Sequence, residues 1–545
     1  MNGAQLLIKC LEAQGVTTIF GIPGAKIDAV FDALEDSSIQ LVVCRHEQNA
    51  AFMAACQGRL TGKPGVVLVT SGPGVANLAT GLLTATTEGD PVIAIGGNVG
   101  RQMKLKSSHQ NVDNAKLLDP VTKSSVEVGA VSAIPEAIAN AFRLSLQAHK
   151  GACFISLPQD ISVETTPATP IFPIQERVSI CASSEDLQSI ANRINKTKFP
   201  VLLLGEESST PKNTATIRKL LAKTKLATVS TYQAAGVVSR TLVDCFAGRV
   251  GLFKNQPGDQ LLKQASLVIT IGFNPVEYDP EIWNADNQID IIHIHQTMAE
   301  CRQGYQPSSE LLGDIDKNLQ GLFSLVNQRD LHPLTQRYHQ ELMDMVAQQQ
   351  SDPSQPIHPL RFIHELKQVV TDDTILACDI GSVYMWMARY FLSYQPHQLL
   401  FSNGQQTLGV ALPWAIATRL LVPQKPIISL SGDGGFLFSA MELETAVRLK
   451  QHFIHFIWTD GSYNMVKEQQ IMKYKRASGV QLGPINVLDF ASSFGAKGYE
   501  LTDADNFVEI FAEASQQTVP VLINVNIDYR DNPKLFASLD EHAGN

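Results

Sequence analysis

The sequence has little of what marks a disordered, fibrous or polyanion-binding protein. Charged residues make up only 18% of its 545 residues, and no basic block stands out against a formal net charge of −10. Nucleic acid and anionic membrane surfaces are therefore not expected as partners. The 44% of apolar residues, together with 37 Gly and 27 Pro, is a globular composition. It excludes a collagen-like, coiled-coil or disordered chain.

Sequence signals for export, membrane insertion and cysteine chemistry are also lacking. The 8 cysteines form no CxxC pair, so scattered reduced thiols are expected rather than a zinc or redox site. The N-terminus, MNGAQLLIKC, has neither the basic region nor the clean apolar region of a secretory signal. Residues 64–87 carry no charge, but they are rich in Gly, Ser, Thr and Pro. We interpret them as buried strand, loop and helix, with a transmembrane span as the alternative, and expect a cytoplasmic protein.

Two stretches interrupt the pattern of apolar runs and indicate connections between domains. One runs from about 163 to 186 and is rich in Thr and Pro, and the other runs from about 328 to 359 and contains QQQSDPSQPIHP. The chain is long enough for several cores of typical domain size. We therefore predict three domains, at residues 1–165, 186–330 and 358–535.

Each predicted domain alternates fully apolar runs with helical patterns. Runs of this kind, separated by helices, are typical of parallel sheets covered on both faces. The expected fold class is α/β, with three consecutive doubly wound parallel-sheet domains. The expected strands are 40–44, 65–69, 91–95 and 152–157 in the first domain, 200–205, 226–230, 267–272 and 290–295 in the second, and 374–379, 426–433, 453–460 and 520–527 in the third.

The third domain contains a strand, a glycine-rich turn and a helix in PIISLSGDGGFLFSAMELETAVRL. Gly434 and Gly435 allow the backbone to approach a ligand closely, and the next helix directs its positive end toward the turn. Asp433 would repel a phosphate there unless a cation such as Mg²⁺ lies between them. Asp460 follows at the end of the next predicted strand, about 27 residues later, as a right-handed crossover requires. The alternative is an ordinary turn in which Asp460 only caps a helix.

The first domain contains a glutamate in a notable position. Glu47 lies just after the strand at 40–44 and begins an Ala-rich, largely apolar helix in CRHEQNAAFMAACQGRL. Burial in such a place favours proton sharing between a carboxyl group and a ligand. A single glutamate in a first helical turn more often only compensates the helix dipole.

These two motifs together resemble those of the thiamine diphosphate (ThDP) enzymes. The family pattern is GDG followed by an Asn or Asp ligand, with RHEQNAAFMA resembling its glutamate segment and VTSGPGVANLATGL the adjoining loop. Within that family, STYQAAGVV, FAGRVGLFKNQPGDQLL, FNPVEYDPEIWN, SNGQQTLGVALPW, SFGAKG and DYRDNP resemble the catabolic, fermentative acetolactate synthases. The resemblance covers nearly the whole chain. It implies a pyrimidine-side domain, a central domain and a diphosphate-side domain.

The resemblance assigns roles to residues at matching positions. Glu47 would activate the cofactor ring, and Asp433, Asp460 and the Ser462 carbonyl would bind Mg²⁺. Catalytic contacts would come from Glu47, Gln110 and Gln469, and the substrate pocket from Lys26, His109, Gln110 and Gln469. Besides Glu47, the expected ThDP contacts are Gly72, Ile380, Gly381, Ser382, Val383, Gln406, Leu408, Asp433, Gly434, Gly435, Ser462, Tyr463, Asn464 and Met465.

The resemblance also implies a reaction and an assembly. Two pyruvates would condense to 2-acetolactate with loss of CO₂, through an enamine of the cofactor. The expected cofactors are ThDP and Mg²⁺, without the FAD of the biosynthetic relatives. We expect a dimer with shared active sites that assembles further into a homotetramer. No regulatory subunit is expected. The rival functions are those of other ThDP enzymes, such as pyruvate oxidase, a 2-oxoacid decarboxylase or glyoxylate carboligase, or of a non-catalytic protein with the same fold.

Some positions depart from the family pattern or are not explained by it. Asp460 replaces the commoner Asn, and Leu408 replaces the commoner Met that supports the bent cofactor. Lys467 and Glu468 stand where smaller or more apolar residues are usual, and we expect both to point outward. His293 and His295 share one face of a predicted strand. We expect packing or polar contacts for this pair rather than a metal site.

Overall fold

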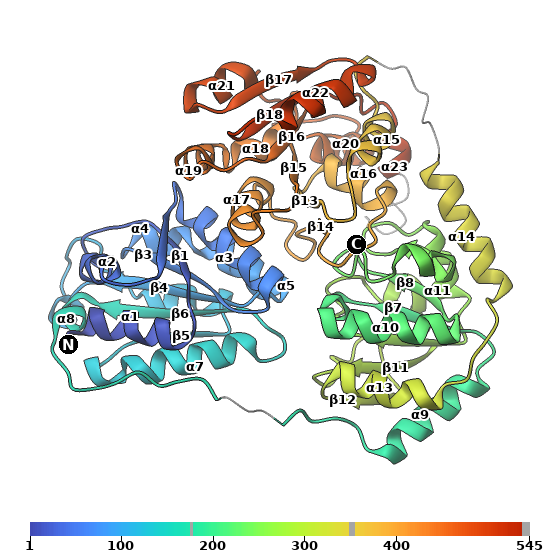
Figure 1. Cartoon of the computed structure of the whole chain (residues 1–545), viewed down its shortest axis with the longest axis horizontal. Coiled ribbons are helices and arrows are strands. Elements are labelled where there is room, and N and C mark those ends of the chain that lie inside the picture. Colours follow the sequence, from blue (N-terminus) through green and yellow to red (C-terminus); the bar gives the residue numbers. More distant parts are fainter. Residues whose placement is uncertain (175–177, 348–354, 537–545) are drawn as a thin grey trace.

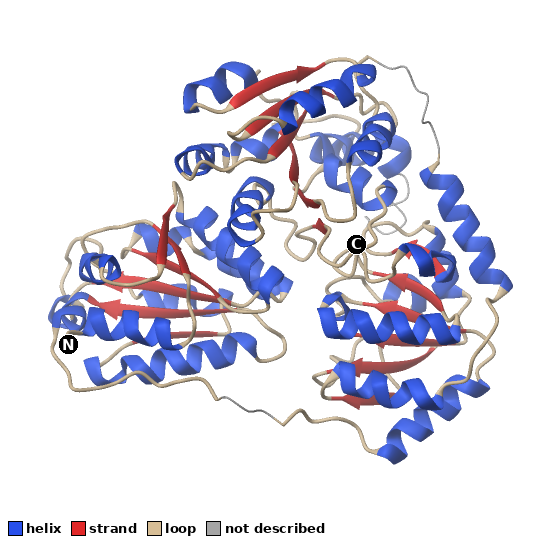
Figure 2. Ribbon diagram, viewed as in Figure 1, coloured by secondary structure: helices blue, strands red, loops and turns tan. Residues whose placement is uncertain are grey.

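The computed structural model describes residues 1–174, 178–347 and 355–536, which form three α/β domains (Figure 1). Each domain contains one six-stranded sheet in which every strand pairing is parallel. Helices lie on both faces of the sheets (Figures 1 and 2). In Figure 1 the first domain is coloured blue to cyan, the central domain green to yellow and the third domain orange to red. The predicted α/β class and its three sheets are confirmed.

The first sheet has the strand order β2-β1-β3-β4-β6-β5. Its strands are β1 (Thr18–Gly21), β2 (Gln40–Val43), β3 (Gly65–Val69), β4 (Val92–Asn98), β5 (Ser124–Glu127) and β6 (Ala152–Pro158). The main helices are α1 (Gly3–Ala13), α2 (Asp28–Glu35), α3 (Glu47–Thr61), α4 (Pro73–Asn77), α5 (Ala79–Glu88), α6 (Asn114–Leu118), α7 (Ile134–Leu146) and α8 (Gln159–Val163). The uncharged segment 64–87 therefore forms β3, α4 and most of α5. Within the described residues, no helix is long and apolar enough to cross a membrane.

The central sheet has the order β12-β11-β10-β7-β8-β9. Its strands are β7 (Pro200–Leu204), β8 (Ala227–Ser230), β9 (Phe246–Arg249), β10 (Leu267–Ile271), β11 (Asp290–His295) and β12 (Ser309–Leu312). The helices are α9 (Ser184–Lys196), α10 (Pro211–Thr224), α11 (Pro257–Lys263), α12 (Glu281–Asn284), α13 (Ile315–Leu325) and α14 (Pro333–Val346).

Helix α14 corrects the interpretation of residues 328–359 as a connection. It lies inside that stretch, and its buried Tyr338 and Leu342 pack into the core of the central domain. The central domain thus extends past residue 330. Parts of both expected connections, 175–177 and 348–354, lie outside the described residues.

The third sheet has the order β14-β13-β15-β16-β18-β17. Its strands are β13 (Ile375–Cys378), β14 (Leu399–Leu400), β15 (Ile427–Gly432), β16 (Ile454–Thr459), β17 (Lys497–Leu501) and β18 (Val521–Asn526). The helices are α15 (Pro359–Val369), α16 (Ser382–Tyr390), α17 (Ala411–Leu421), α18 (Asp433–Leu437), α19 (Leu443–Arg448), α20 (Asn464–Tyr474), α21 (Val487–Phe494), α22 (Phe507–Ser515) and α23 (Asn532–Phe536).

Helix α3 joins the first domain to the third. The ring of His46 caps its start by accepting from the Gln48 amide at 3.1 Å, and Gly62 ends it with a left-handed φ of 67°. Small side chains along α3 pack against α17 in one continuous core. Because the side chain of Ala is small, the backbones of the two helices can approach each other closely. The catalytic candidate Glu47 therefore begins a helix that the third domain supports.

A buried ion-pair cluster around Arg59 strengthens the same interface. Arg59 on α3 donates to both carboxylate oxygens of Asp90, at 2.9 and 2.8 Å, and to Glu88 at 3.2 Å. It also donates to the Phe401 carbonyl of the third domain at 2.7 Å, and its guanidinium lies 4.7 Å from the ring centre of Trp414. Burial raises the pKa of both carboxyl groups, and the Arg59 charge opposes that rise.

We predict that Arg59→Met strongly destabilises the protein. The change leaves the carboxylates of Glu88 and Asp90 buried without their cation, and breaking one partner of a buried ion pair costs about 3–5 kcal/mol. Urea unfolding followed by tryptophan fluorescence should show an earlier transition for the interface around Trp414. The matched control is Arg143→Met, because Arg143 lies exposed on α7. An equal midpoint for the two variants would contradict the prediction.

Candidate active site

A cavity of about 300 Å³ lies at the carboxyl ends of the third sheet, next to β13, β15 and β16. This edge is where doubly wound sheets bind ligands. The cavity brings together every site residue that the sequence predicted in this domain, namely Ile380, Gly381, Ser382, Val383, Gln406, Leu408, Asp433, Gly434, Gly435, Asp460, Ser462, Tyr463, Asn464, Met465 and Gln469. Gly432, Trp458, Val466 and Tyr529 also line it and were not predicted.

The glycine turn after β15 has no room for side chains. A Cβ on Gly434 would lie 2.6 Å from the Tyr463 ring, and one on Gly435 would lie 2.8 Å from a carboxylate oxygen of Asp379. Contacts below 3.0 Å require something to shift. The turn is therefore packed tightly beneath the cavity, so a ligand can approach its backbone.

Asp433 and Asp460 supply two carboxylates to the cavity. Asp433 accepts from the amides of Gly434, at 2.9 Å, and Gly461, at 2.8 Å. Burial and the nearby Asp460 raise the pKa of Asp433 to about 6, although these amide bonds act in the opposite direction. Asp460 accepts from Ser462 Oγ at 2.7 Å.

These donors fit a hard divalent cation. Among the described residues, neither Asp433 nor Asp460 forms an ion pair with a basic side chain. No group of three or more His, Cys, Asp and Glu side chains in the described part of the chain could hold a metal alone. A metal here would therefore complete its shell with backbone carbonyl, ligand or water oxygens. Mg²⁺ characteristically binds in this way, through one or two carboxylates and phosphate oxygens.

A buried amide network orients Asp460 and was not predicted from the sequence. Asn464 donates to Asp460 at 2.8 Å and accepts from Ser382 Oγ at 3.0 Å. Asn532 donates to both Asn464 and Ser382, and Trp386 Nε1 donates to Asn532 at 2.7 Å. Asn532 lies in DYRDNP, so only that segment's resemblance could have indicated it.

Asp379 is a second unpredicted organiser of the cavity. It is 1% exposed, and its carboxylate accepts from the amides of Ile380, at 2.8 Å, and Gly409, at 2.9 Å. Burial raises its pKa to about 7. Through these hydrogen bonds, Asp379 connects the segment of Ile380–Val383 to the loop that carries Gln406 and Leu408. Leu408 is half-buried and packs on the core, and Gln406 has a φ of 49°.

The predicted residues of the first domain form a separate group. Glu47 is 9% exposed and accepts from Asn77 Nδ2 at 2.9 Å. Ser71 Oγ donates to the Gln110 carbonyl at 2.8 Å, and a Cβ on Gly72 would contact the Gln110 side chain at 3.3 Å. His109 is exposed, and Lys26 Nζ lies 3.5 Å from Gln159. None of Lys26, Glu47, Gly72, His109 and Gln110 lines the cavity of the third domain.

Lys467 and Glu468 do not line the cavity either. Both are half-buried on α20, whereas Met465, Val466 and Gln469 of the same segment line the cavity. Burial raises the pKa of Glu468. The pair therefore lies away from the cavity, on a face less solvated than the sequence predicted.

His293 and His295 make polar contacts, as expected. The ring of His293 lies 2.8 Å from the Tyr305 hydroxyl and 3.1 Å from the Thr297 carbonyl. His295 stacks on His293 and lies 3.6 Å from Glu207. Burial lowers the pKa of His293 to about 4.

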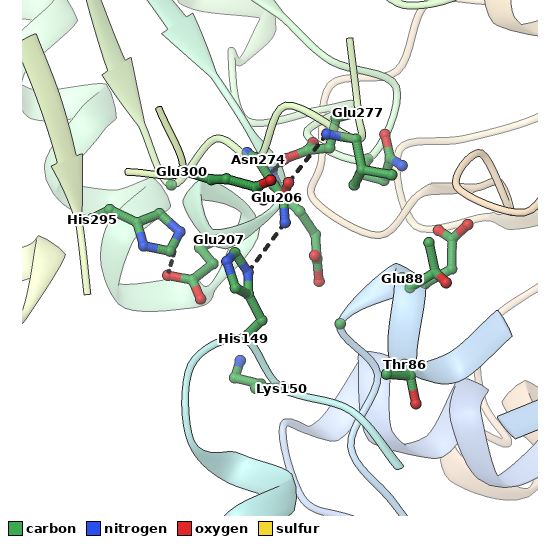
Figure 3. A pocket seen from close by; sticks show the side chains of 15 residues that line it. Thr86, Glu88, His149, Lys150, Glu206, Glu207, Asn274, Glu277, His295 and Glu300 are labelled. Atoms are coloured by element: carbon green, nitrogen blue, oxygen red, sulfur yellow. Dashed lines mark hydrogen bonds and ion pairs between the residues drawn. The ribbon is translucent and has the colours of Figure 1, made fainter. Parts of the chain in front are cut away.

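His295 also borders an acidic cavity of about 270 Å³ between the first and central domains (Figure 3). The cavity lies at the carboxyl ends of β7 and β10, where the strand order of the central sheet reverses. Its lining includes the acidic residues Glu206, Glu207, Glu277 and Glu300 and the basic residue Lys150. Burial raises the pKa of Glu206 far above its usual range and that of Glu277 to about 7.

Comparison with known proteins places this architecture in a family. Models of thiamine pyrophosphate enzymes match the N-terminal TPP binding domain at residues 1–117, the central domain at 187–322 and the C-terminal TPP binding domain at 379–525. Thiamine pyrophosphate is another name for ThDP. The chain therefore belongs to the thiamine pyrophosphate enzyme family, and the predicted membership is confirmed.

Within the family, the chain is similar to acetolactate synthases over nearly its full length. It is 49% identical to "Acetolactate synthase" of Bacillus subtilis (strain 168), over 98% of this chain and 94% of that protein. It is 45% identical to "Acetolactate synthase, catabolic" of Raoultella terrigena, over 99% and 97%. "Acetolactate synthase isozyme 2 large subunit" of Escherichia coli (strain K12) is 29% identical over 98% and 96%. The predicted resemblance to ThDP-dependent acetolactate synthases is thus confirmed.

Proposed function

We propose that this enzyme condenses two molecules of pyruvate into 2-acetolactate and releases CO₂. The observation that carries the proposal is the sequence identity of 49% and 45% to two acetolactate synthases, one of them named catabolic, over nearly the whole chain. The third-domain cavity supports it, because the predicted cofactor residues converge there. Bound ThDP would supply the electron sink that decarboxylation and carbon–carbon bond formation require.

We propose for these residues the roles that the family resemblance implies, and their convergence on one cavity supports the assignment. Asp433, Asp460 and the Ser462 carbonyl would hold Mg²⁺, and the turn at Gly434 and Gly435 would contact the cofactor diphosphate. Ile380, Gly381, Ser382 and Val383 would contact the same group, with Tyr463, Asn464 and Met465 beside it. Leu408 would support the bent cofactor, and the backbone of Gln406 would face its ring. Gln469 lines the cavity and is exposed, so it could donate to a substrate oxygen.

We propose that two chains complete each active site. Glu47, Gly72, Gln110, His109 and Lys26 belong to the first domain and do not reach the cavity of their own third domain. A second copy would bring them there, with Glu47 facing the cofactor ring and the others facing ring or substrate. Exposed apolar side chains support this arrangement, since they flank both groups: Met103, Leu105 and Val112 in the first domain, and Leu437, Phe438 and Met441 in the third.

The assembly would then be at least a homodimer, and we propose a homotetramer. We propose further that it works without a regulatory subunit and in the cytoplasm. Size measurement by light scattering on the purified chain alone tests the oligomeric state.

We also propose that the enzyme does not use FAD. Doubly wound sheets bind dinucleotides at the carboxyl ends of strands beside the reversal of strand order. In the central domain this position is the acidic cavity of Figure 3, where the carboxylates of Glu207 and Glu300 would lie beside the diphosphate of a dinucleotide. Like charges placed close together are unfavourable. A flavin absorbance band in the purified protein would contradict this proposal.

The decisive experiment identifies the product formed from pyruvate alone. We expect purified enzyme with ThDP and Mg²⁺ to form 2-acetolactate and one CO₂ for every two pyruvates, at a rate that added FAD does not change. The product can be identified by nuclear magnetic resonance with ¹³C-pyruvate. Acetaldehyde as the main product would indicate a decarboxylase, and acetyl phosphate in phosphate buffer would indicate a pyruvate oxidase. No turnover at all would favour a non-catalytic role.

A further inference from the structure

Glu442 is a fully buried glutamate of the third domain that contacts the start of α3. Its exposed fraction is 0%. One carboxylate oxygen accepts from the backbone amide of Arg45 at 2.8 Å, and the other accepts from Asn49 Nδ2 at 2.8 Å. Thr445 Oγ1 donates to the first oxygen at 2.7 Å. The carboxylate thus spans two domains through three directed hydrogen bonds.

These bonds bracket Glu47. Arg45 lies two residues before it and Asn49 two residues after it, and Asn49 is 0% exposed. One bond fixes the backbone that enters α3, and the other fixes its first turn. Because both sides of Glu47 are held, the direction in which its side chain leaves the helix is set by the third domain as well as by the His46 cap.

The groups that donate hydrogen bonds to Glu442 are neutral. The contact therefore acts mainly by fixing the position of the start of α3. The Arg45 side chain turns away, toward Glu444 at 3.3 Å and the Cys44 carbonyl at 3.1 Å. Burial raises the pKa of Glu442, although its three hydrogen bonds and the nearby Arg45 charge act in the opposite direction. A buried charge held by neutral donors contributes little as an ion pair, whereas its hydrogen bonds have a strict geometry.

We propose that Glu442 is the positioning residue for Glu47. The inference rests on the proposed function in one respect, the catalytic role of Glu47. Glu442 follows the glycine turn of Gly434 and Gly435 by only a few residues, through α18 and a short 3-10 helix at Ala440–Glu442. One continuous segment therefore forms the proposed diphosphate turn and holds the helix that carries the catalytic carboxylate.

The first test uses the protein without cofactor. We expect Glu442→Ala to speed amide hydrogen exchange at residues 45–50 by about tenfold or more, with the rest of the first domain unchanged. Glu444→Ala is the matched control, because Glu444 contacts the side chain of Arg45 instead of its amide. Unchanged exchange at 45–50 would overturn the proposal. Faster exchange throughout the first domain would also overturn it, since Glu442 would then be only structural.

The second test measures turnover with ThDP, Mg²⁺ and pyruvate. Misplacing a reacting group by about 1 Å can cost about 10²-fold in rate. We expect Glu442→Ala to lower kcat by about 10- to 100-fold, with KM for pyruvate and the affinity for ThDP changed less than about threefold. Glu444→Ala should keep the starting kcat. An unchanged kcat in Glu442→Ala, or a loss confined to KM, would overturn the proposal.

Conservative rescue gives the sharpest result. Glu442→Gln keeps an oxygen for the Arg45 amide. Its new amide would meet Asn49 Nδ2, so the Asn49 amide must turn over; the Asn49 Oδ1, which is buried and has no hydrogen-bond partner among the described residues, can then accept from the new amide. We expect Glu442→Gln to recover kcat to within about threefold. If Glu442→Ala does not fold, Asn49→Ala removes one of the same bonds from the other domain and should lower kcat in the same direction.

The outcomes separate this inference from the proposed function. Full activity of Glu47→Gln would refute the role of Glu47, while the exchange test would still report whether Glu442 orders residues 45–50. A product other than 2-acetolactate would refute the proposed reaction, and the kcat comparison would apply to that product instead.

Discussion

Glu47→Gln is expected to lower kcat by about 10²- to 10⁴-fold, the usual contribution of a positioned acid–base group. The amide has nearly the same shape as the carboxylate and can still accept a hydrogen bond from Asn77. It cannot take up and return a proton. We propose that proton sharing between Glu47 and a ring nitrogen of the cofactor activates the bound ThDP, so the loss should fall on catalysis. Steady-state kinetics with pyruvate measures it, and calorimetry should show a ThDP affinity within about tenfold of the starting protein.

The control is the same substitution at another helix start. Glu136 lies in the first turn of α7 and is exposed. If Glu47 only compensated the helix dipole, both substitutions would have small effects, of about 0.3–1 kcal/mol on stability. We expect Glu136→Gln to keep the starting kcat. Normal activity of Glu47→Gln would refute its assignment as the activating carboxylate.

The sequence predicted the interior strands of the three sheets well. Runs such as those forming β3 and β7 are apolar on both faces, because helices cover both sides of each sheet. The unpredicted strands were β1 and five of the six edge strands, β5, β9, β12, β14 and β17. Strands β5, β12 and β17 are only partly buried, so their composition differs little from that of loops. Strands β9 and β14 are buried, but they have only four and two residues and gave no apolar run to recognise. β1 has only four residues and lacked a run long enough to recognise.

Helix α14 shows a different limit of sequence interpretation. Its segment, PLTQRYHQELMDMV, is mostly polar, and its buried residues include only Thr335, Tyr338 and Leu342. One narrow apolar stripe is enough to hold this helix in the fold, because the stripe packs onto the core of the central domain. The neighbouring Gln- and Pro-rich residues made the whole stretch resemble a linker, and the helix period was hidden among them.

The site residues also divide into those that local sequence patterns predict and those that depend on distant contacts. Residues of the strand ends and turns could be predicted, because the spacing of Asp433 and Asp460 follows from the length of one crossover. Asn532, Asp379 and Glu442 could not be predicted. Each acts through contacts with segments far away in the chain, as when Glu442 meets Arg45 and Asn49. Nothing local distinguishes such a residue from an ordinary helix or loop residue.

Asp433→Ala is expected to weaken ThDP binding by more than about 100-fold in saturating Mg²⁺. Residues that only support metal ligands typically cost about 10- to 100-fold in metal affinity when removed, and a direct ligand should cost more. The change removes one of two carboxylates and leaves the amides of Gly434 and Gly461 without their acceptor. Titration calorimetry measures the affinity, and quenching of the cavity-lining Trp458 gives an independent signal.

A graded series separates loss of the metal from loss of the fold. Asp433→Asn keeps an oxygen for one glycine amide but lacks the charge, so its affinity should lie between those of Asp433→Ala and the starting protein. Asp373→Ala is the control, because its carboxylate is exposed in the same domain and lies 4.0 Å from Lys425. Raising Mg²⁺ should partly restore ThDP binding in Asp433→Asn, since binding of the two is coupled through the shared diphosphate oxygens. Unchanged ThDP affinity in Asp433→Ala would contradict the metal site, because a −10 chain would then hold an anionic cofactor without the cation between them.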